Sequence, residues 1–107
     1  MAVYEAMTET FDELLDTDYA VVDFYGTFCN PCKALAPVFE EASEDFPVLR
    51  FIKVNTDHNK ALSKRFRIFG VPTLIFFRNG RRFHQVSGYM PRETLNEHIA
   101  KLLYGEK

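Results

Sequence analysis

Cys29-Asn30-Pro31-Cys32 directly follows the apolar run at residues 20–25 and opens a stretch whose apolar residues have helical spacing. Two cysteines three positions apart at the start of a helix lie close enough to pair. They also lie where backbone N–H groups stabilise a thiolate. The sequence contains 2 cysteines, so no third cysteine competes with this pair. The segment therefore predicts a reversible two-electron switch at the junction of a strand and a helix.

The length of 107 residues indicates one domain, over residues 1–107, with a single continuous core. Apolar residues make up 47% of the chain, and the formal net charge is −2 with acidic and basic residues mixed. There is no basic run that would suggest nucleic acid, and no block of like charge. No apolar stretch approaches the roughly 18 residues needed to span a bilayer. We therefore expect neither nucleic acid nor a membrane as a partner.

The first seven residues lack the basic and apolar regions of a secretory signal. Secreted domains of this size usually carry several cysteine pairs, so one C-x-x-C pair favours an intracellular redox role. We expect a cytoplasmic protein; a leader removed before residue 1 is the alternative.

Apolar spacing alternates between strand-like and helix-like along the chain. Strands are predicted at 2–7, 20–25, 48–54, 73–77 and 82–87, with a hairpin turn at Asn79-Gly80. A short helix is predicted to start at residue 10, and three further helices are predicted at 29–46, 60–66 and 93–103. This order predicts an α/β fold with a central mixed sheet of four to five strands and helices on both faces. Ligand chemistry in such sheets lies beyond the carboxyl ends of the strands, where Cys29 falls.

Several residues carry narrower expectations. Thr10-Phe11-Asp12-Glu13 matches a capping box, and Pro37 should kink the second helix. His58, His84 and His98 are expected on the solvated surface. Residues expected to face inward from the helices are Phe11, Leu14, Leu15, Leu35, Val38, Phe39, Ala42, Phe46, Ala61, Leu62, Phe66, Leu95, Ile99, Leu102 and Leu103.

Further segments accompany the cysteine pair in a fixed order. Through these segments and the cysteine pair, the sequence resembles the thioredoxin family over nearly its whole length. The resemblance implies the thioredoxin fold and an enzyme of thiol–disulfide exchange with no bound cofactor or metal. The segments are Val22-Asp23-Phe24-Tyr25, Cys29-Asn30-Pro31-Cys32-Lys33, Ala36-Pro37, Lys53-Val54-Asn55-Thr56-Asp57, Phe69-Gly70-Val71-Pro72-Thr73, Phe76-Phe77-Arg78-Asn79-Gly80 and Gly88.

Two departures from the family pattern lie at the reactive edge. Phe28 stands where tryptophan is usual, and Asn30 stands where glycine is usual. Pro31 precedes the second cysteine, as in thioredoxins. Glutaredoxins usually carry proline after the first cysteine, and disulfide isomerases carry histidine before the second. The departures bear on partner choice and redox potential rather than on the type of reaction.

In the expected reaction, Cys29 is exposed at the helix start and attacks a protein disulfide as a thiolate. Cys32, one turn later and more buried, then attacks Cys29 and releases the reduced substrate. Two other interpretations exist. A permanent disulfide clip would close too small a loop to remove much unfolded-state entropy. A zinc site needs about four ligands, and the three histidines lack ligand spacing.

Asp23 places a carboxylate inside an apolar strand, where burial should raise its pKa. The resemblance makes it the proton acceptor for Cys32, through water. An edge-facing or hydrogen-bonded structural aspartate is the alternative. By the same analogy Lys53 lies near Asp23 and modulates its charge, unless it is a plain solvated lysine.

Val71-Pro72 resembles the family's cis-proline loop, although base rates for X–Pro bonds favour trans. A cis bond would turn the Val71 backbone toward an extended substrate peptide. Phe28, Gly88 and Tyr89 would join Val71 and Pro72 as an apolar landing surface around Cys29. Taken singly, Phe28 or Tyr89 fits a core position equally well. We expect the remaining phenylalanines in the core.

Together these features predict a monomeric, cytoplasmic protein disulfide reductase and electron carrier. Its partners would be disulfide-containing client proteins and thioredoxin reductase. Phe28 and Asn30 leave open an oxidant or isomerase-like variant. A binding subunit that uses the fold without catalysis is the alternative from another class.

Overall fold

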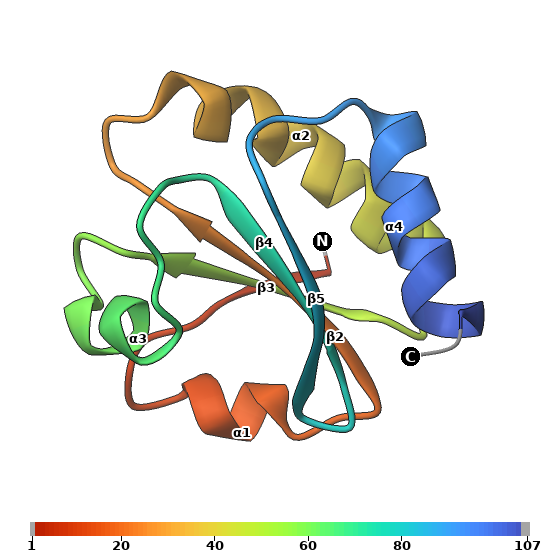
Figure 1. Ribbon diagram of the computed structural model, residues 1–107, viewed down its shortest axis with the longest axis horizontal. Helices are drawn as coiled ribbons and strands as arrows, with labels where there is room; N and C mark the ends of the chain where they lie inside the picture. The colour runs from red at the N-terminus through yellow and green to blue at the C-terminus, as the bar shows by residue number, and fades with distance from the viewer. Residues whose placement is uncertain (1, 106–107) are drawn as a thin grey trace.

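The computed structural model describes residues 2–105 and shows a five-stranded mixed sheet with helices on both faces (Figure 1). This confirms the predicted α/β architecture; the expected domain limits at residues 1 and 107 lie outside the described residues. The elements are β1 (Val3–Glu5), α1 (Phe11–Leu15), β2 (Tyr19–Tyr25), α2 (Asn30–Asp45), β3 (Arg50–Asn55), α3 (Lys60–Arg65), β4 (Thr73–Arg78), β5 (Arg81–Ser87) and α4 (Arg92–Tyr104).

The order of strands in the sheet is β1-β3-β2-β4-β5. β1, β3 and β2 run parallel, whereas β4 is antiparallel to β2 and β5 is antiparallel to β4. Tyr25 pairs with Asn55 at the carboxyl end of β2, and Phe24 pairs with Thr73 at the beginning of β4. The loops after β2, after β3 and before β4 therefore meet at one edge of the sheet.

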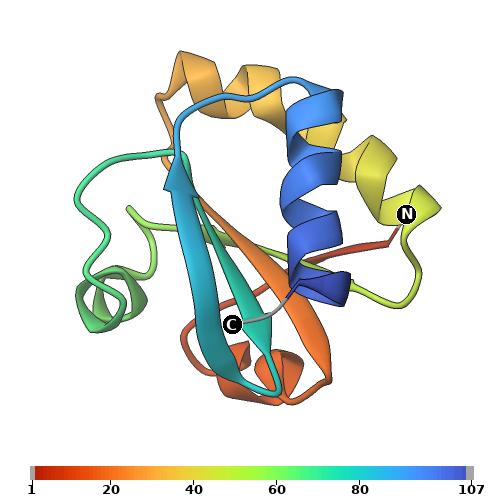
Figure 2. The ribbon, with the colours of Figure 1, turned by 45° about the vertical axis from the view of Figure 1, so that its right-hand side comes forward.

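Alternation along β2 divides the core into two layers. Ala20, Val22 and Phe24 pack with α1 and α3 on one face. Val21 packs on the other face with residues of α2 and α4. Figures 1 and 2 show α2 and α4 together on one side of the sheet and α1 and α3 on the other. Asp23, two residues after Val21, consequently lies on the face that α2 covers.

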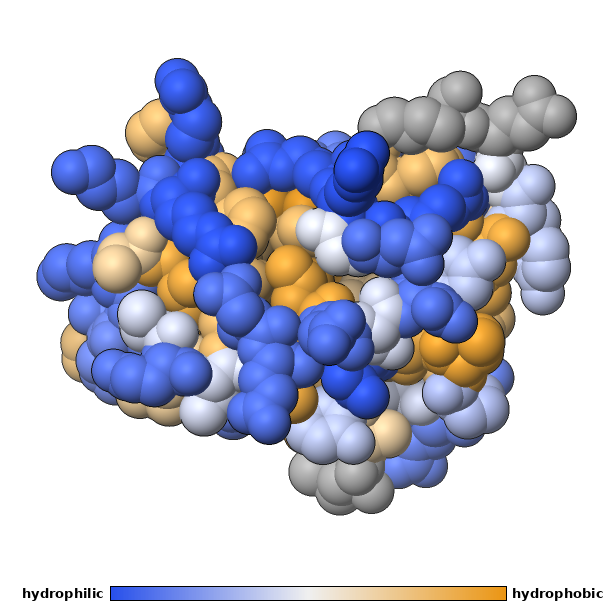
Figure 3. Space-filling model, turned by 90° about the horizontal axis from the view of Figure 1, so that it is seen from below, coloured by the Kyte–Doolittle hydropathy of each residue, from blue (hydrophilic) through white to orange (hydrophobic). Residues whose placement is uncertain are grey.

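Polar side chains dominate the face that is seen from the side of α1, with apolar residues showing between them (Figure 3). None of the helices between residues 2 and 105 has the length and apolar character needed to cross a bilayer.

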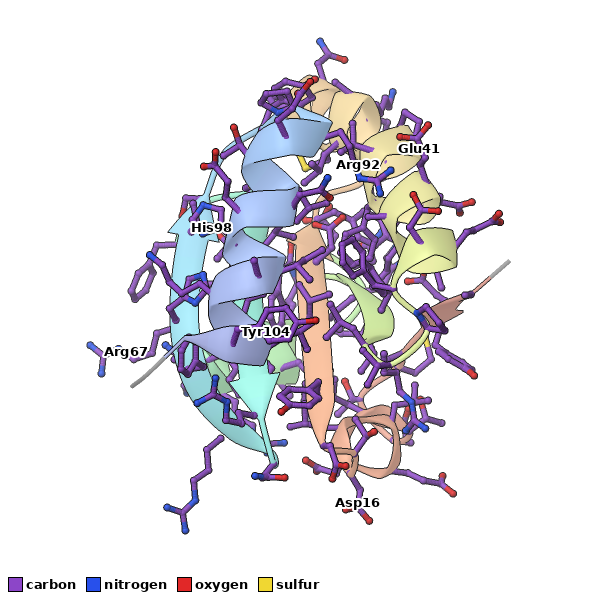
Figure 4. All side chains as sticks on the ribbon, turned by 90° about the vertical axis from the view of Figure 1, so that its right-hand side faces the viewer. Asp16, Glu41, Arg67, Arg92, His98 and Tyr104 are labelled. Carbon is purple, nitrogen blue, oxygen red and sulfur yellow. A yellow bond between two sulfur atoms is a disulfide. The ribbon has the colours of Figure 1, made fainter. Side chains whose placement is uncertain are left out.

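Arg92 joins α4 to α2 through two ion pairs. Its guanidinium donates to Glu41 Oε1 at 2.8 Å and to Asp45 Oδ2 at 2.6 Å. Figure 4 shows Arg92 and Glu41 pointing toward one another between the two helices. Arg92 is 22% exposed, whereas Glu41 and Asp45 are 69% and 63% exposed, so solvent screens both pairs.

We expect Arg92→Gln to lower the free energy of unfolding by about 1 kcal/mol, because screened pairs of this kind each contribute a fraction of that amount. Urea unfolding at low and high salt measures the effect, which should shrink as salt rises. Lys101→Gln, on the exposed side of the same helix, is the matched control. A loss that is equal at both salt concentrations would contradict an electrostatic origin.

Three local predictions are wrong. Thr10 precedes α1 but makes no side-chain cap, because its backbone is already near-helical and its hydroxyl accepts the Met7 N–H at 3.0 Å instead. The strand predicted at 48–54 begins at Arg50 instead, and Val48 is exposed, because residues 46–49 form a turn closed by the Leu49 N–H and the Phe46 carbonyl. Ala61 is exposed, because Leu62 and Phe66 fill the inner face around α3.

The second helix begins at Asn30, with Cys29 as its N-cap, and ends at Asp45. It continues through Pro37, whose ring nitrogen cannot donate to the Lys33 carbonyl. The hairpin at Asn79-Gly80 is present, with positive φ angles of 54° and 78°.

Two histidines and one phenylalanine lie elsewhere than expected. His84 stacks on Phe76 at 4.4 Å between ring centroids, and its Nε2 lies 3.1 Å from His98 Nδ1. Both histidines are half-buried, since β5 and α4 come together over Phe76; burial lowers the pKa of His98. Phe69 is 89% exposed rather than in the core, because no helix within residues 2–105 covers the loop between α3 and β4.

Candidate active site

A short loop, residues 26–28, carries the chain from β2 to the cysteine pair. The Thr27 N–H donates to Asp57 Oδ2 at 2.9 Å, and Asn55 Nδ2 donates to Thr27 Oγ1 at 3.2 Å. Hydrogen bonding by Thr27, chiefly from its backbone N–H, holds the pKa of Asp57 below its usual value. A Cβ at Gly26 would lie 3.3 Å from Val71 Cγ2, so the loop packs closely against its neighbour. The turn that presents the cysteines is thus fixed from the end of β3.

Cys29 and Cys32 form a disulfide, with their Cα atoms 5.2 Å apart. Cys29 has extended backbone angles, φ −138° and ψ 104°, and its Sγ accepts the Cys32 N–H at 3.3 Å. The sulfur therefore takes the place of an N-cap oxygen. Pro31 lies in the first turn of α2 and has no N–H, so it leaves the Cys32 donor to the sulfur.

The exposure of Cys29 differs from the prediction. Its exposed fraction is 9%, because its Sγ faces Cys32 on one side and lies 3.8 Å from the Val71 carbonyl oxygen on the other. Cys32 is 4% exposed, so the expected order of burial holds. An attacking or departing group therefore reaches the pair through a small opening at Cys29.

The peptide bond between Val71 and Pro72 is cis, as the resemblance implies. The Pro72 carbonyl accepts the Gly88 N–H at 2.8 Å, and Gly88 has a φ of 95° that favours glycine. This bond joins the start of β4 to the end of β5 beside the cysteine pair. Around this edge Phe28 is 95% exposed and Tyr89 is half-exposed.

Asp23 is fully buried, and neither carboxylate oxygen has a hydrogen-bond partner among the described residues. Burial raises its pKa to about 7; the charge of Lys53 opposes this shift and that of Glu5 adds to it. The interpretation as an edge-facing or hydrogen-bonded aspartate is thereby wrong. Asp23 pairs with Lys53 in the register of β2 and β3, as expected.

Lys53, the register partner of Asp23, lines a pocket of about 300 Å³. Its Nζ lies 4.4 Å from the centroid of the Tyr25 ring, and the Tyr25 hydroxyl donates to Glu5 Oε2 at 2.8 Å. Burial and this bond hold the pKa of Tyr25 far above its usual value. The pocket is lined by Cys32 as well as by Lys53 and Tyr25, so solvent has access beside the second cysteine.

No group of three or more histidine, cysteine, aspartate or glutamate side chains within residues 2–105 has the arrangement of a metal site. Sequence reasoning missed Asp57 as the anchor of the reactive loop and placed Phe69 in the core. Asp57 had a usable signal, since it follows β3 by two residues at the edge where Cys29 lies.

A disulfide-forming C-x-x-C pair at the N-terminus of a helix, beyond the carboxyl end of a central strand, defines a thiol–disulfide oxidoreductase. Comparison with known proteins identifies the family. The family model described as Thioredoxin matches residues 2–101. Thioredoxins of Staphylococcus saprophyticus and Staphylococcus haemolyticus are each 36% identical to this chain over 104 residues, which is 96% of this chain and 100% of theirs. The thioredoxin of Staphylococcus aureus strain Mu50 is 34% identical over the same shares.

The chain belongs to the thioredoxin family, and its fold is the thioredoxin fold. The predicted enzyme class, thiol–disulfide oxidoreductase, is confirmed.

Proposed function

We propose that this protein works in the reducing direction, as a cytoplasmic, monomeric electron carrier that reduces disulfides in client proteins and is recharged by thioredoxin reductase. The observation that carries the proposal is the Cys29–Cys32 disulfide at the start of α2, with Cys29 the more exposed of the two residues. Staphylococcal relatives named thioredoxin match nearly the whole chain, which supports the same assignment.

Reduction proceeds in two exchanges. The Cys29 thiolate attacks one sulfur of the client disulfide, which forms a mixed disulfide and expels the other client sulfur as a thiolate. Cys32 then loses its proton and attacks Cys29 Sγ, which restores the Cys29–Cys32 disulfide and expels the second client thiolate. Two electrons pass to the client, and the reductase returns two electrons and two protons to the pair.

The start of α2 assists both exchanges. The Cys32 N–H already donates to Cys29 Sγ at 3.3 Å, and a charged sulfur would strengthen this hydrogen bond. An unperturbed cysteine is only about 3% thiolate at pH 7, so this stabilisation increases the reactive fraction. Pro31 fits the first turn of α2 because its missing N–H is one that would have no partner within the helix.

Asp23 accepts the proton that Cys32 loses in the second exchange. Its carboxyl group is buried on the face that α2 covers, and its pKa of about 7 suits a base at neutral pH. Lys53 modulates that charge from the paired strand. The pocket that Lys53 and Cys32 both line can hold the water that relays the proton from Cys32 toward Asp23.

Clients bind on the surface formed by Phe28, Val71, Pro72, Gly88 and Tyr89. The Val71 carbonyl lies beside Cys29, where an extended client segment can pair with backbone groups of this loop. Phe28 and Tyr89 supply exposed aromatic area next to this position.

Turnover with insulin tests the proposal. With dithiothreitol as the electron source, the protein should speed the reduction of insulin disulfides well above the rate of dithiothreitol alone, read as turbidity from the released chains. A rate equal to that of dithiothreitol alone would contradict the reductase assignment.

The exposed Phe28 and the exposed Asn30 at the reactive edge favour one second candidate, an oxidant or isomerase-like enzyme. Equilibration of the pair with glutathione separates the two functions. The reductase proposal predicts a potential near the value of about −270 mV already known for thioredoxins; a value near −120 mV, as for strong oxidants, would favour the second candidate.

A further inference from the structure

A groove of about 590 Å³ runs along the outer side of α3 and ends at Phe69. Lys60 and Lys64 line it from α3 at a spacing of four residues, which places them on one side of the helix. Arg67 joins the lining from the turn after α3, where its φ of 59° ends the helical path. Leu62 and Phe66 hold the opposite side of this segment in the core. The groove therefore has a cationic wall on a firmly packed support.

The three cations lining the groove are exposed and, within residues 2–105, form no ion pair. The neighbouring Arg65 contrasts with them, because it is paired with Asp12 at 2.9 Å on the other side of the helix. Figure 4 shows Arg67 extending away from the ribbon.

Asp57 is the carboxylate in the groove lining, and it already accepts the Thr27 N–H at 2.9 Å. One carboxylate against three cations leaves the groove positively charged. This charge is complementary to an acidic segment of polypeptide.

Phe69 supplies an apolar contact at the end of this groove. Its side chain is 89% exposed, and it precedes Val71 by two residues, a separation of at most about 7 Å along the chain. The Val71 carbonyl in turn lies 3.8 Å from Cys29 Sγ. The groove, Phe69 and the reactive sulfur thus follow one another along the same edge of the sheet.

We propose that this groove, formed by Lys60, Lys64, Arg67 and Phe69, binds an acidic segment of the client polypeptide that lies beside the disulfide under attack. Phe69 receives an apolar side chain of the client between its acidic residues and its cysteine. This inference rests on the proposed function, since it names the class of client that the reductase prefers.

Two synthetic peptides test the preference of the wild-type protein. Each carries one disulfide and a leucine beside one cysteine, followed by four glutamates in one peptide and four lysines in the other. At low salt kcat/KM should be about 10-fold higher for the glutamate peptide. The ratio should approach 1 in about 1 M salt, where the screening length falls to about 3 Å.

Variants locate the preference. In Lys60→Gln/Lys64→Gln the ratio should fall from about 10 to about 2, whereas Lys101→Gln/Arg81→Gln removes two exposed cations elsewhere and should keep it. Phe69→Ser should raise KM for both peptides about 5-fold, since its apolar contact does not depend on the peptide's charge. Thermal unfolding of each variant verifies that it is folded.

The outcomes separate this inference from the proposed function. Equal kcat/KM for the two peptides, or an equal fall of the ratio in both double variants, would overturn the groove proposal while insulin reduction stands. Loss of exchange with both peptides and with insulin in the wild-type protein would instead overturn the reductase assignment itself.

Discussion

Cys29→Ser should reduce insulin turnover to the rate of dithiothreitol alone. A serine hydroxyl is a far weaker nucleophile than a thiolate at neutral pH, and Cys32 cannot replace it. Cys32 is only 4% exposed, against 9% for Cys29. The same insulin assay measures the result, and persistent turnover by Cys29→Ser would show that the nucleophile is misassigned.

Cys32→Ser should give a different defect. Cys29 still attacks the client, but no neighbouring thiol displaces it, so the mixed disulfide accumulates. The tethered thiol in the wild-type protein acts at a high effective concentration, which is why its loss stops the second exchange rather than the first. Mass spectrometry of the protein mixed with a disulfide client should find the covalent adduct. The variant that lacks both cysteines is the control and should show none.

Asp23→Asn should stabilise the protein at alkaline pH by about 4 kcal/mol relative to the wild type, and much less near pH 4. Burial raises the pKa of Asp23 to about 7 in the folded state, against 3.8 for the unperturbed group. A difference of about three pKa units corresponds to about 4 kcal/mol. Lys53 is the cation that offsets part of the cost of ionising this carboxylate.

The sign follows from proton uptake. Between about pH 4 and pH 7 the unfolded chain has lost this proton while the folded protein keeps it, so stability falls as pH rises. Below that window both states are protonated, and above it both are ionised with the full penalty present. Asparagine cannot ionise, so the free energy of unfolding of the variant does not fall in this way as pH rises.

Urea unfolding of the disulfide form at pH 4, 7 and 9 measures the difference. Asp16→Asn, at an exposed carboxylate after α1, is the matched control and should show no such trend. A stabilisation by Asp23→Asn that is the same at all three pH values would contradict the ionisation of buried Asp23 as its cause. Because asparagine cannot accept the Cys32 proton, slower release of mixed disulfides should accompany the gain in stability.

Much of the fold could be predicted because periodicity reports directly on burial. The apolar run before Cys29 became the central strand, and the inward face of the last helix was correct at Leu95, Ile99 and Leu102. Asp23 was detectable for the same reason, as a charged residue in an otherwise apolar strand. The cis bond before Pro72 came from the family resemblance alone, because local sequence favours trans.

The failures concern contacts between segments far apart in the chain. Whether Phe69 is covered depends on which helix lies over its loop, and nothing in the local sequence specifies that. The pairing of His84 with His98 arises only when β5 and α4 meet over Phe76. The small exposed area of Cys29 likewise depends on Val71, 42 residues along the chain.

The hydrogen bonds and contacts that shape the reactive turn come from Asn55, Asp57 and Val71, well outside the segment that carries the sulfurs. A short peptide with the same two thiols would lack all three, and we expect it to behave as an ordinary dithiol reagent. Selective electron delivery is therefore a property of the assembled molecule. During refolding, the recovery of selective disulfide reduction should therefore coincide with the recovery of the native population. The enzyme's own reaction then measures the fraction of molecules that have folded correctly.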